Sequence, residues 1–106
     1  MRKLLLVLAC FALLSVAAKP PGATLSIASD DGTDVVVAVS LENSLKHEAG
    51  SVWVMAVCYD AAGVPVTRQD AGDEGGLAGP FQRSADHCAA WAYVFGEGIV
   101  SDALSF

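Results

Sequence analysis

Basic residues are scarce in this chain of 106 residues. Six lysines and arginines stand against twelve aspartates and glutamates, which gives a formal charge of −6. Nucleic acids and anionic membrane surfaces both bind through basic patches, so neither is expected as a partner. Asparagine is scarcer still, because Asn43 is the only one and Leu45 stands where N-glycosylation requires serine or threonine.

Catalytic motifs are also lacking. The sequence contains no Gly-x-Ser-x-Gly elbow, which is the sharp turn that exposes the nucleophile of many serine hydrolases. Its nearest combination of nucleophile, acid and histidine is Ser84, Asp86 and His87, which is local in sequence and is interpreted as a loop cap. We therefore predict that the protein is not an enzyme.

Metal-binding residue types occur, but without the spacing of a metal motif. Neighbouring residues of a strand point to opposite faces, so adjacent ligands such as His87 and Cys88 would not share a site. Two acidic clusters remain as calcium alternatives, although the first is also ordinary turn chemistry. We expect no metal and no other cofactor. The residues considered are His47, Met55, Cys58, His87 and Cys88 for transition metals, and Asp30, Asp31, Asp34, Asp70, Asp73 and Glu74 for calcium.

What the sequence does have is a leader of the secretory type. Arg2 and Lys3 precede an apolar run over residues 4–14, and small residues follow. This pattern predicts a signal peptide over residues 1–18, cleaved after Ala18 or, as second choice, after Ala17. The apolar run is too short for a membrane-spanning helix, which needs roughly 20 residues. A lipoprotein with Cys10 acylated is an alternative, but the apolar run continues past this cysteine.

Cleavage would change both the charge and the cysteine count. Residues 19–106 are expected to form one domain with four basic and twelve acidic residues, a formal charge of −8. Cys58 and Cys88 remain, and an even count in a small secreted domain predicts a disulfide. The chain-entropy model gives such a bond roughly 3.5 kcal/mol, which is a large share for a domain whose core alone is marginal.

Short β-branched and aromatic runs recur between clusters of glycine, proline and aspartate. This pattern, without helical periodicity, predicts an all-β antiparallel β-sandwich of six or seven strands. Residues 70–79, acidic and rich in glycine, are expected to form a loop, and 96–98 the turn of the last hairpin. Pro65 places its strand at a sheet edge. The expected strands are 24–29, 35–41, 52–59, 64–68, a short one around Phe81, 88–95 and 99–106.

The two cysteines also predict a register. If strands 52–59 and 88–95 are antiparallel neighbours, Cys58 lies opposite Cys88 and paired residue numbers sum to 146. One face of this pair then carries only small side chains, and the other carries large ones, because side chains alternate along a strand. Aromatic rings fill the gap of about 10 Å between two sheets better than alanines do. This favours the large face as the core.

Part of the chain resembles a known family. Leu41-Glu42-Asn43-Ser44, the valine-rich run that closes in Tyr59-Asp60, and the turn at Gly63 are similar to FxLYD-type domains of bacterial extracytoplasmic proteins. The resemblance covers roughly residues 35–95 and implies an immunoglobulin-like sandwich of no established catalytic activity. It also implies that Val52, Val54, Ala56 and Cys58 point inward. This alternative leaves Trp53, Met55, Trp91 and Tyr93 outward, as an aromatic platform for sugar rings, a peptide or another subunit.

These features together predict a secreted or periplasmic, non-catalytic binding or accessory module stapled by a disulfide. Its ligand is expected to be a protein or a glycan, through Trp53, Met55, Trp91 and Tyr93 if that face is exposed. The alternative is a small secreted effector or inhibitor that makes contact through the 70–79 loop. The oligomeric state is left open by the sequence.

Overall fold

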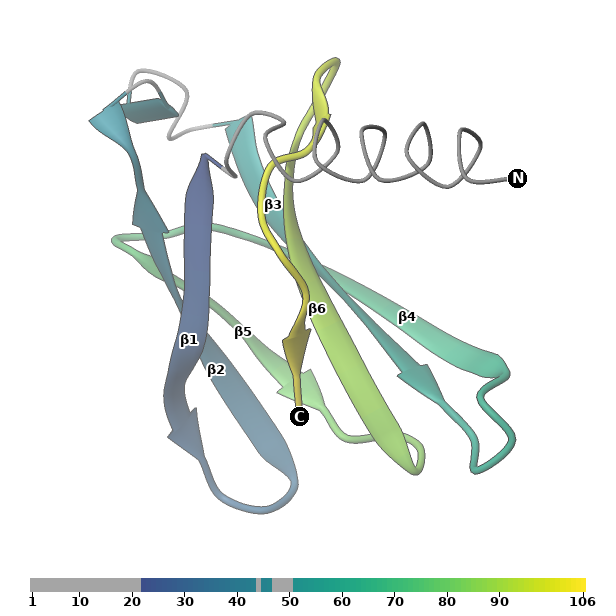
Figure 1. Cartoon of the computed structure of the whole chain (residues 1–106). Coiled ribbons are helices and arrows are strands. Elements are labelled where there is room, and N and C mark those ends of the chain that lie inside the picture. The colour runs from purple at the N-terminus through teal and green to yellow at the C-terminus, as the bar shows by residue number, and fades with distance from the viewer. Residues whose placement is uncertain (1–21, 44, 47–50) are drawn as a thin grey trace, which may run out of the picture.

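The computed structural model describes residues 22–43, 45–46 and 51–106, which form two antiparallel β-sheets packed face to face (Figure 1). The all-β, two-sheet architecture predicted from the sequence is therefore confirmed. The expected signal peptide, including Cys10, and the histidine His47 lie outside the described residues. Across the described ranges, no helix has the length and apolar character needed to cross a membrane.

Three strands in the order β1-β2-β5 make up the first sheet. Its β1–β2 turn is held by carboxylates, because Asp30 accepts a hydrogen bond from the backbone N–H of Gly32 and Asp31 accepts those of Thr33 and Asp34. Aspartate and glycine favour such turns for this reason. The strands are β1 (Ala23–Asp30), β2 (Asp34–Leu41) and β5 (Leu77–Gln82).

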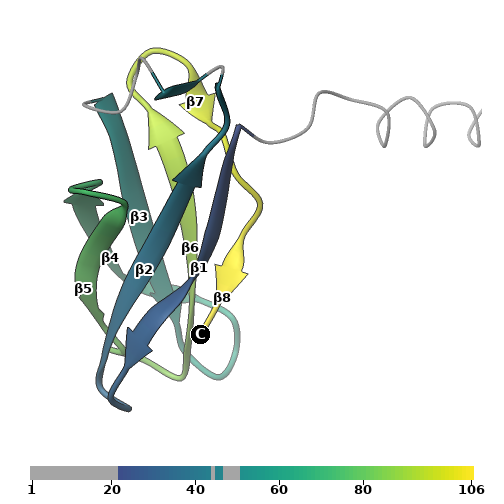
Figure 2. The ribbon, with the colours of Figure 1, turned by 90° about the vertical axis from the view of Figure 1, so that its left-hand side faces the viewer.

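The second sheet has the order β4-β3-β6-β7, and the short strand β8 also pairs with β6. The sheet edge at β4 accommodates Pro65, as the sequence predicted. Figure 2 views the molecule through the first sheet, with β3 and β6 behind β2. The strands are β3 (Val52–Tyr59), β4 (Pro65–Gly72), β6 (His87–Val94), β7 (Gly98–Ile99) and β8 (Leu104–Ser105).

The last predicted strand, 99–106, is divided into β7 and β8. Between them, the hydroxyl of Ser101 accepts a hydrogen bond from the backbone N–H of Ala92 at 2.8 Å. A side chain thus takes the place of a backbone acceptor, and the regular ladder beside β6 is interrupted there. Beyond the interruption, Phe106 and Cys88 exchange backbone hydrogen bonds, so the two segments flank the same strand.

The predicted register of β3 and β6 is confirmed along the whole pair. Val52 pairs with Val94, Trp53 with Tyr93, and each further pair follows to Cys58 opposite Cys88. The two cysteines form a disulfide with their Cα atoms 4.0 Å apart. Directly opposed residues of antiparallel strands come close enough for this bond. The disulfide therefore joins neighbouring strands of one sheet and is fully buried.

The small face of β3 and β6 forms the core, so the preferred expectation of a large aromatic core is wrong. Residues Val52, Val54 and Ala56 are at most 1% exposed, as are Ala90, Ala92 and Val94 opposite them. The larger side chains of the core come from the other sheet, where Phe81 of β5 is the largest fully buried side chain among the described residues. The valines of β2 join the same buried cluster. Alanines on one sheet are thus matched by larger residues on the facing sheet.

The expected loop over residues 70–79 is also wrong, because most of it is strand. β4 continues to Gly72, β5 begins at Leu77, and only residues 73–76 connect them. The side chain of Asp73 accepts a hydrogen bond from the backbone N–H of Gly76, and Glu74 and Leu77 form a bridge. Glycine and aspartate disfavour strands on average, but the neighbouring strand overrides that preference here.

Removal of the disulfide should cost much of the stability of this small domain. The double variant Cys58→Ala/Cys88→Ala releases a loop with a sequence separation of 30 residues, so we expect a loss of roughly 3.5 kcal/mol in unfolding free energy. Urea denaturation measures it. Wild-type protein kept reduced is the control, because it retains both sulfur atoms in the core. Equal unfolding midpoints for oxidised and reduced protein would contradict the prediction.

Candidate functional site

The side of the second sheet that faces away from the core carries large, partly exposed side chains. Every second residue of β3 and β6 points to this side, and the strand pairing extends it onto β4 and β7. We call this surface the outer aromatic face. It consists of Trp53, Met55, Val57 and Tyr59 of β3, His87, Ala89, Trp91 and Tyr93 of β6, Arg68, Asp70 and Gly72 of β4, and Ile99 of β7, with Phe95 adjoining.

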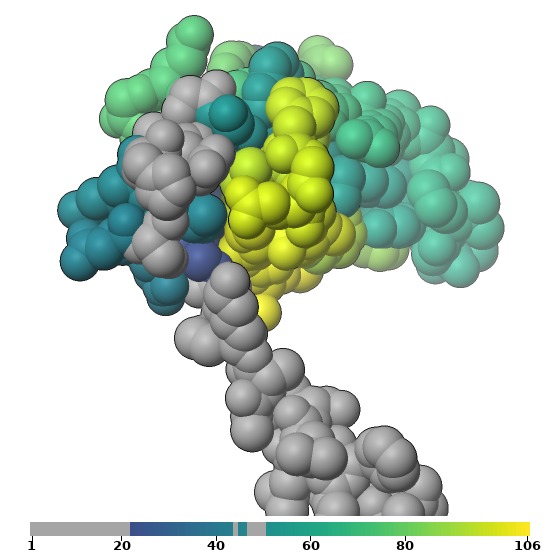
Figure 3. Space-filling model, turned by 90° about the horizontal axis from the view of Figure 1, so that it is seen from above, coloured from purple at the N-terminus to yellow at the C-terminus, as the bar shows by residue number. Residues whose placement is uncertain are grey.

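One end of the outer aromatic face is an apolar cluster. The ring of Phe95 meets Trp53 and Tyr93 edge to face, at centroid distances of 6.0 and 5.6 Å. Such arrangements are favourable between aromatic rings. Phe95 is nevertheless 65% exposed and Ile99, which pairs with Tyr93, is 56% exposed. The β6–β7 turn, which lies at this end of the face, is exposed at the surface (Figure 3, yellow).

A glycine of the edge strand lies beside this cluster. Gly72 of β4 lies opposite Trp53 in the sheet, and a Cβ atom at Gly72 would come within 3.7 Å of the indole ring. The indole therefore lies across the backbone of the edge strand. This contact explains why Trp53 is only partly exposed although it points away from the core.

Three polar side chains are joined across the middle of the face. Arg68 donates two hydrogen bonds to the carboxylate of Asp70, at 2.8 and 3.0 Å, and the hydroxyl of Tyr93 donates a third at 2.7 Å. The bonds from Arg68 hold the pKa of Asp70 below its ordinary value. Partial burial, followed by the bond to Asp70, raises the pKa of Tyr93. This network links β6 to β4 over the intervening strand β3.

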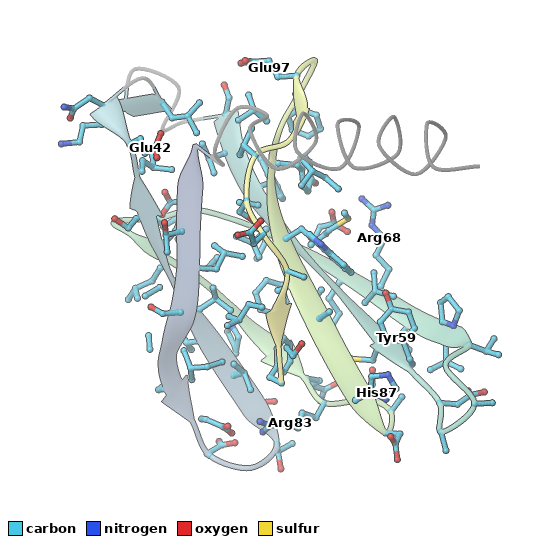
Figure 4. The ribbon with its side chains drawn as sticks, viewed as in Figure 1. Glu42, Tyr59, Arg68, Arg83, His87 and Glu97 are labelled. Carbon is cyan, nitrogen blue, oxygen red and sulfur yellow. A yellow bond between two sulfur atoms is a disulfide. The ribbon has the colours of Figure 1, made fainter. Side chains whose placement is uncertain are left out.

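The other end of the face is hollowed. Figure 4 shows Tyr59, Arg68 and His87 on the same side of the molecule. The rings of Tyr59 and His87 stack at 5.3 Å, and His87 also lies 3.0 Å from Asp86. A shallow hollow of about 490 Å³ opens beside Tyr59, and its lining is mostly apolar. The lining residues are Val57, Tyr59, Pro65, Val66, Thr67 and Arg68.

The structure brings together the four residues predicted as a platform. Trp53, Met55, Trp91 and Tyr93 all lie on the outer aromatic face and all are partly exposed. The sequence interpretation missed Asp70 because it ended the strand at Arg68, and it missed Arg68 because it predicted no pairing register for that strand. Alternation places Arg68 and Asp70 on one face, and pairing with β3 puts that face beside Met55. Phe95 and Ile99 were missed because they flank a turn.

Among the residues that the structure describes, the alternative catalytic and metal sites do not assemble. Ser84 hydrogen bonds to Thr67, whereas His87 bonds to Asp86. Across residues 22–43, 45–46 and 51–106, no group of three or more histidine, cysteine or acidic side chains is placed to hold a metal ion. In the β1–β2 turn, the carboxylate of Asp30 is occupied by Arg83, at 2.5 and 2.6 Å. The carboxylates of Asp30 and Asp31 are therefore engaged by the turn's own backbone and by one arginine, whereas Oδ1 of Asp34 is buried without a hydrogen-bond partner.

The Asp30–Arg83 pair should be visible in a pH titration. Hydrogen bonds from Arg83 lower the pKa of Asp30 from 3.8 to about 2. A carboxyl with a lowered pKa contributes stability above its unfolded pKa, and the contribution disappears as the pH falls through the folded value. For Asp30 this loss runs from about pH 4 to about pH 2.

Arg83→Gln should move the Asp30 midpoint back towards 3.8, as followed by NMR of the carboxyl carbon. The Asp70 carboxyl is the internal control, because it keeps its own arginine, Arg68. An Asp30 midpoint that is unchanged in Arg83→Gln would contradict the pairing.

Comparison with protein-family models, with curated proteins and with solved structures finds no match to this chain. No relative therefore supplies a function, a ligand or a set of conserved residues. The chemistry of the outer aromatic face is what remains to indicate a function.

Proposed function

We propose that this chain is a secreted, non-catalytic binding module that recognises its ligand through the outer aromatic face. Secretion rests on the leader pattern of residues 1–18 and is supported by the Cys58–Cys88 disulfide, since such bonds persist in oxidising compartments. Residues 19–106 act in this proposal as one independent domain.

The observation that carries the proposal is the exposure of large apolar side chains on one sheet face. An antiparallel sheet in a two-sheet domain needs only one apolar face, and its outer face is ordinarily polar. Here β3 and β6 present tryptophan, tyrosine and methionine outward instead. Contiguous exposed apolar surface of this kind marks interaction sites. Aromatic residues are also the commonest anchors of binding energy.

We further propose that the domain is immunoglobulin-like. The order β4-β3-β6-β7 beside β1-β2-β5 fits a sandwich in which the sheet containing the third and sixth strands has one added edge strand. The FxLYD-type resemblance of residues 35–95 is consistent with this. Two features depart from antibody domains, because the disulfide lies within one sheet and Trp53 points away from it.

Paired substitutions test the proposal on glycan arrays and on displayed peptide libraries. Phe95→Ser/Ile99→Ser removes the two most exposed apolar side chains of the face, so we expect at least a tenfold loss of affinity for any recognised ligand. Leu77→Ser is the matched control, because Leu77 is 47% exposed on the other sheet.

The proposal would be contradicted if every recognised ligand bound the wild-type chain, Phe95→Ser/Ile99→Ser and Leu77→Ser with equal affinity. They would direct attention to another surface, and the 73–76 turn of the alternative effector or inhibitor function would be the first to examine. Circular dichroism of each variant separates loss of binding from loss of fold.

A further inference from the structure

We infer that the ligand of the outer aromatic face is a protein surface with an apolar centre bordered by lysine or arginine. This inference rests on the proposed binding function and adds the chemical class of the partner. It is carried by three observations: the residue types at the centre of the face, the charges at its two ends, and the internal pairing of its polar groups.

The centre of the face has the composition of a protein interface. Aromatic residues, methionine and arginine are enriched in such interfaces, whereas lysine, glutamate and aspartate are depleted. The face contains two tryptophans, Tyr93, Met55 and Arg68, and Asp70 is its one acidic member. The aromatic rings are braced by one another and by the sheet, so little conformational freedom remains to be lost on binding.

Acidic residues gather at both ends of the face. Asp60 follows β3 and Asp86 precedes β6 at the hollowed end. At the apolar end, Asp73 follows β4 and Glu97 lies in the β6–β7 turn. Arg68 is the one arginine on the face, and its charge is balanced by Asp70. A largely apolar face with acidic ends, whose one ion pair is balanced internally, is complementary to an apolar patch with a basic border.

The polar groups of the face argue against a glycan. Sugar hydroxyls require hydrogen-bond partners, and a buried polar group left without one costs about 1–3 kcal/mol. The carboxylate of Asp70 already accepts three hydrogen bonds, from Arg68 and Tyr93. The one carboxylate in the middle of the face is therefore already engaged, which leaves a sugar hydroxyl little to donate to there. A second copy is also disfavoured, because its acidic ends would meet those of the first.

Four labelled peptides test the inference on the purified, disulfide-bonded chain. Three share an apolar centre of leucine and phenylalanine and are flanked by lysine, serine or glutamate, and the fourth carries lysine flanks around a serine centre. Fluorescence anisotropy gives each dissociation constant at low and at high salt. We expect the lysine-flanked apolar peptide to bind about tenfold more tightly than its serine-flanked counterpart at low salt, and the gap to narrow at high salt.

Two charge reversals provide a matched pair. Glu97→Lys and Glu42→Lys change the net charge of the chain equally, and both glutamates are exposed at the same end of the molecule (Figure 4). Only Glu97 adjoins the outer aromatic face, whereas Glu42 follows β2 of the other sheet. Glu97→Lys should weaken binding of the lysine-flanked apolar peptide about threefold or more. Glu42→Lys should weaken it clearly less, because Glu42 follows a strand of the other sheet and the effect of an exposed charge falls with distance and with salt.

Each other outcome overturns the inference. If Glu97→Lys and Glu42→Lys weakened binding equally, the peptide would be attracted only to the overall negative charge of the chain. The same would follow if the lysine-flanked peptide with a serine centre bound as tightly as the one with an apolar centre. Absence of binding by the lysine-flanked apolar peptide, preference for the serine- or glutamate-flanked peptide, or face-dependent binding of a glycan alone would show a different ligand class. Self-association abolished by Phe95→Ser/Ile99→Ser would identify a second copy as the occupant. If the ligand is of a different class or is a second copy, the proposed binding function still stands. That proposal fails only if Phe95→Ser/Ile99→Ser weakens the binding of no ligand.

Discussion

The alternation of small and large side chains along β3 and β6 is the constraint from which the rest of the structure follows. The Cys58–Cys88 bond ties the two strands at one end, and a shift of one residue would turn every side chain to the opposite face. With this register, each small residue meets a small one and each large residue meets a large one. The sheet therefore has one smooth face of valine, alanine and cysteine. Its other, rough face carries aromatic rings and Met55, with one small pair, Val57 and Ala89, among them.

The smooth face determines how the two sheets fit. Valines of β2 and Phe81 of β5 fill the space that the alanines of β3 and β6 leave. A core of such small residues buries modest apolar area, so its contribution to stability is limited. The disulfide lies within this core and restricts the unfolded chain. In a domain of this size, the small core supplies only part of the stability, and the disulfide supplies a further part.

Much of the fold was predictable from the sequence, because its signals are local or covalent. The β-branched run Val52–Tyr59 predicted that strand with its observed bounds, and the cysteine pair predicted its register with β6. The choice of inner face was not predictable from one strand pair. It depends on what the opposite sheet contributes, and the burial of Phe81 is a property of the packed molecule. The extent of β4 was likewise missed, because pairing with β3 outweighs the poor strand preference of Asp70, Ala71 and Gly72.

The candidate site was predictable only as an alternative. The family resemblance placed Trp53, Met55, Trp91 and Tyr93 outward, whereas the space-filling argument placed them inward. Neither line of reasoning supplied the polar network, because the Tyr93–Asp70 bond joins residues on two strands that are not neighbours. Such a contact depends on the lengths and directions of side chains across an intervening strand, and sequence spacing does not encode it.

The acidity of the chain and the exposure of its aromatic face are best understood together. An apolar patch on a small domain promotes self-association, and the usual protection is a net charge far from zero. Here acidic residues stand at both ends of the patch, while the opposite charges of Arg68 and Asp70 in its middle balance each other. When two copies approach face to face, their acidic ends repel each other. A partner with a basic border would not meet this repulsion. These carboxylates therefore disfavour a second copy on the face and favour the basic-bordered partner that we propose.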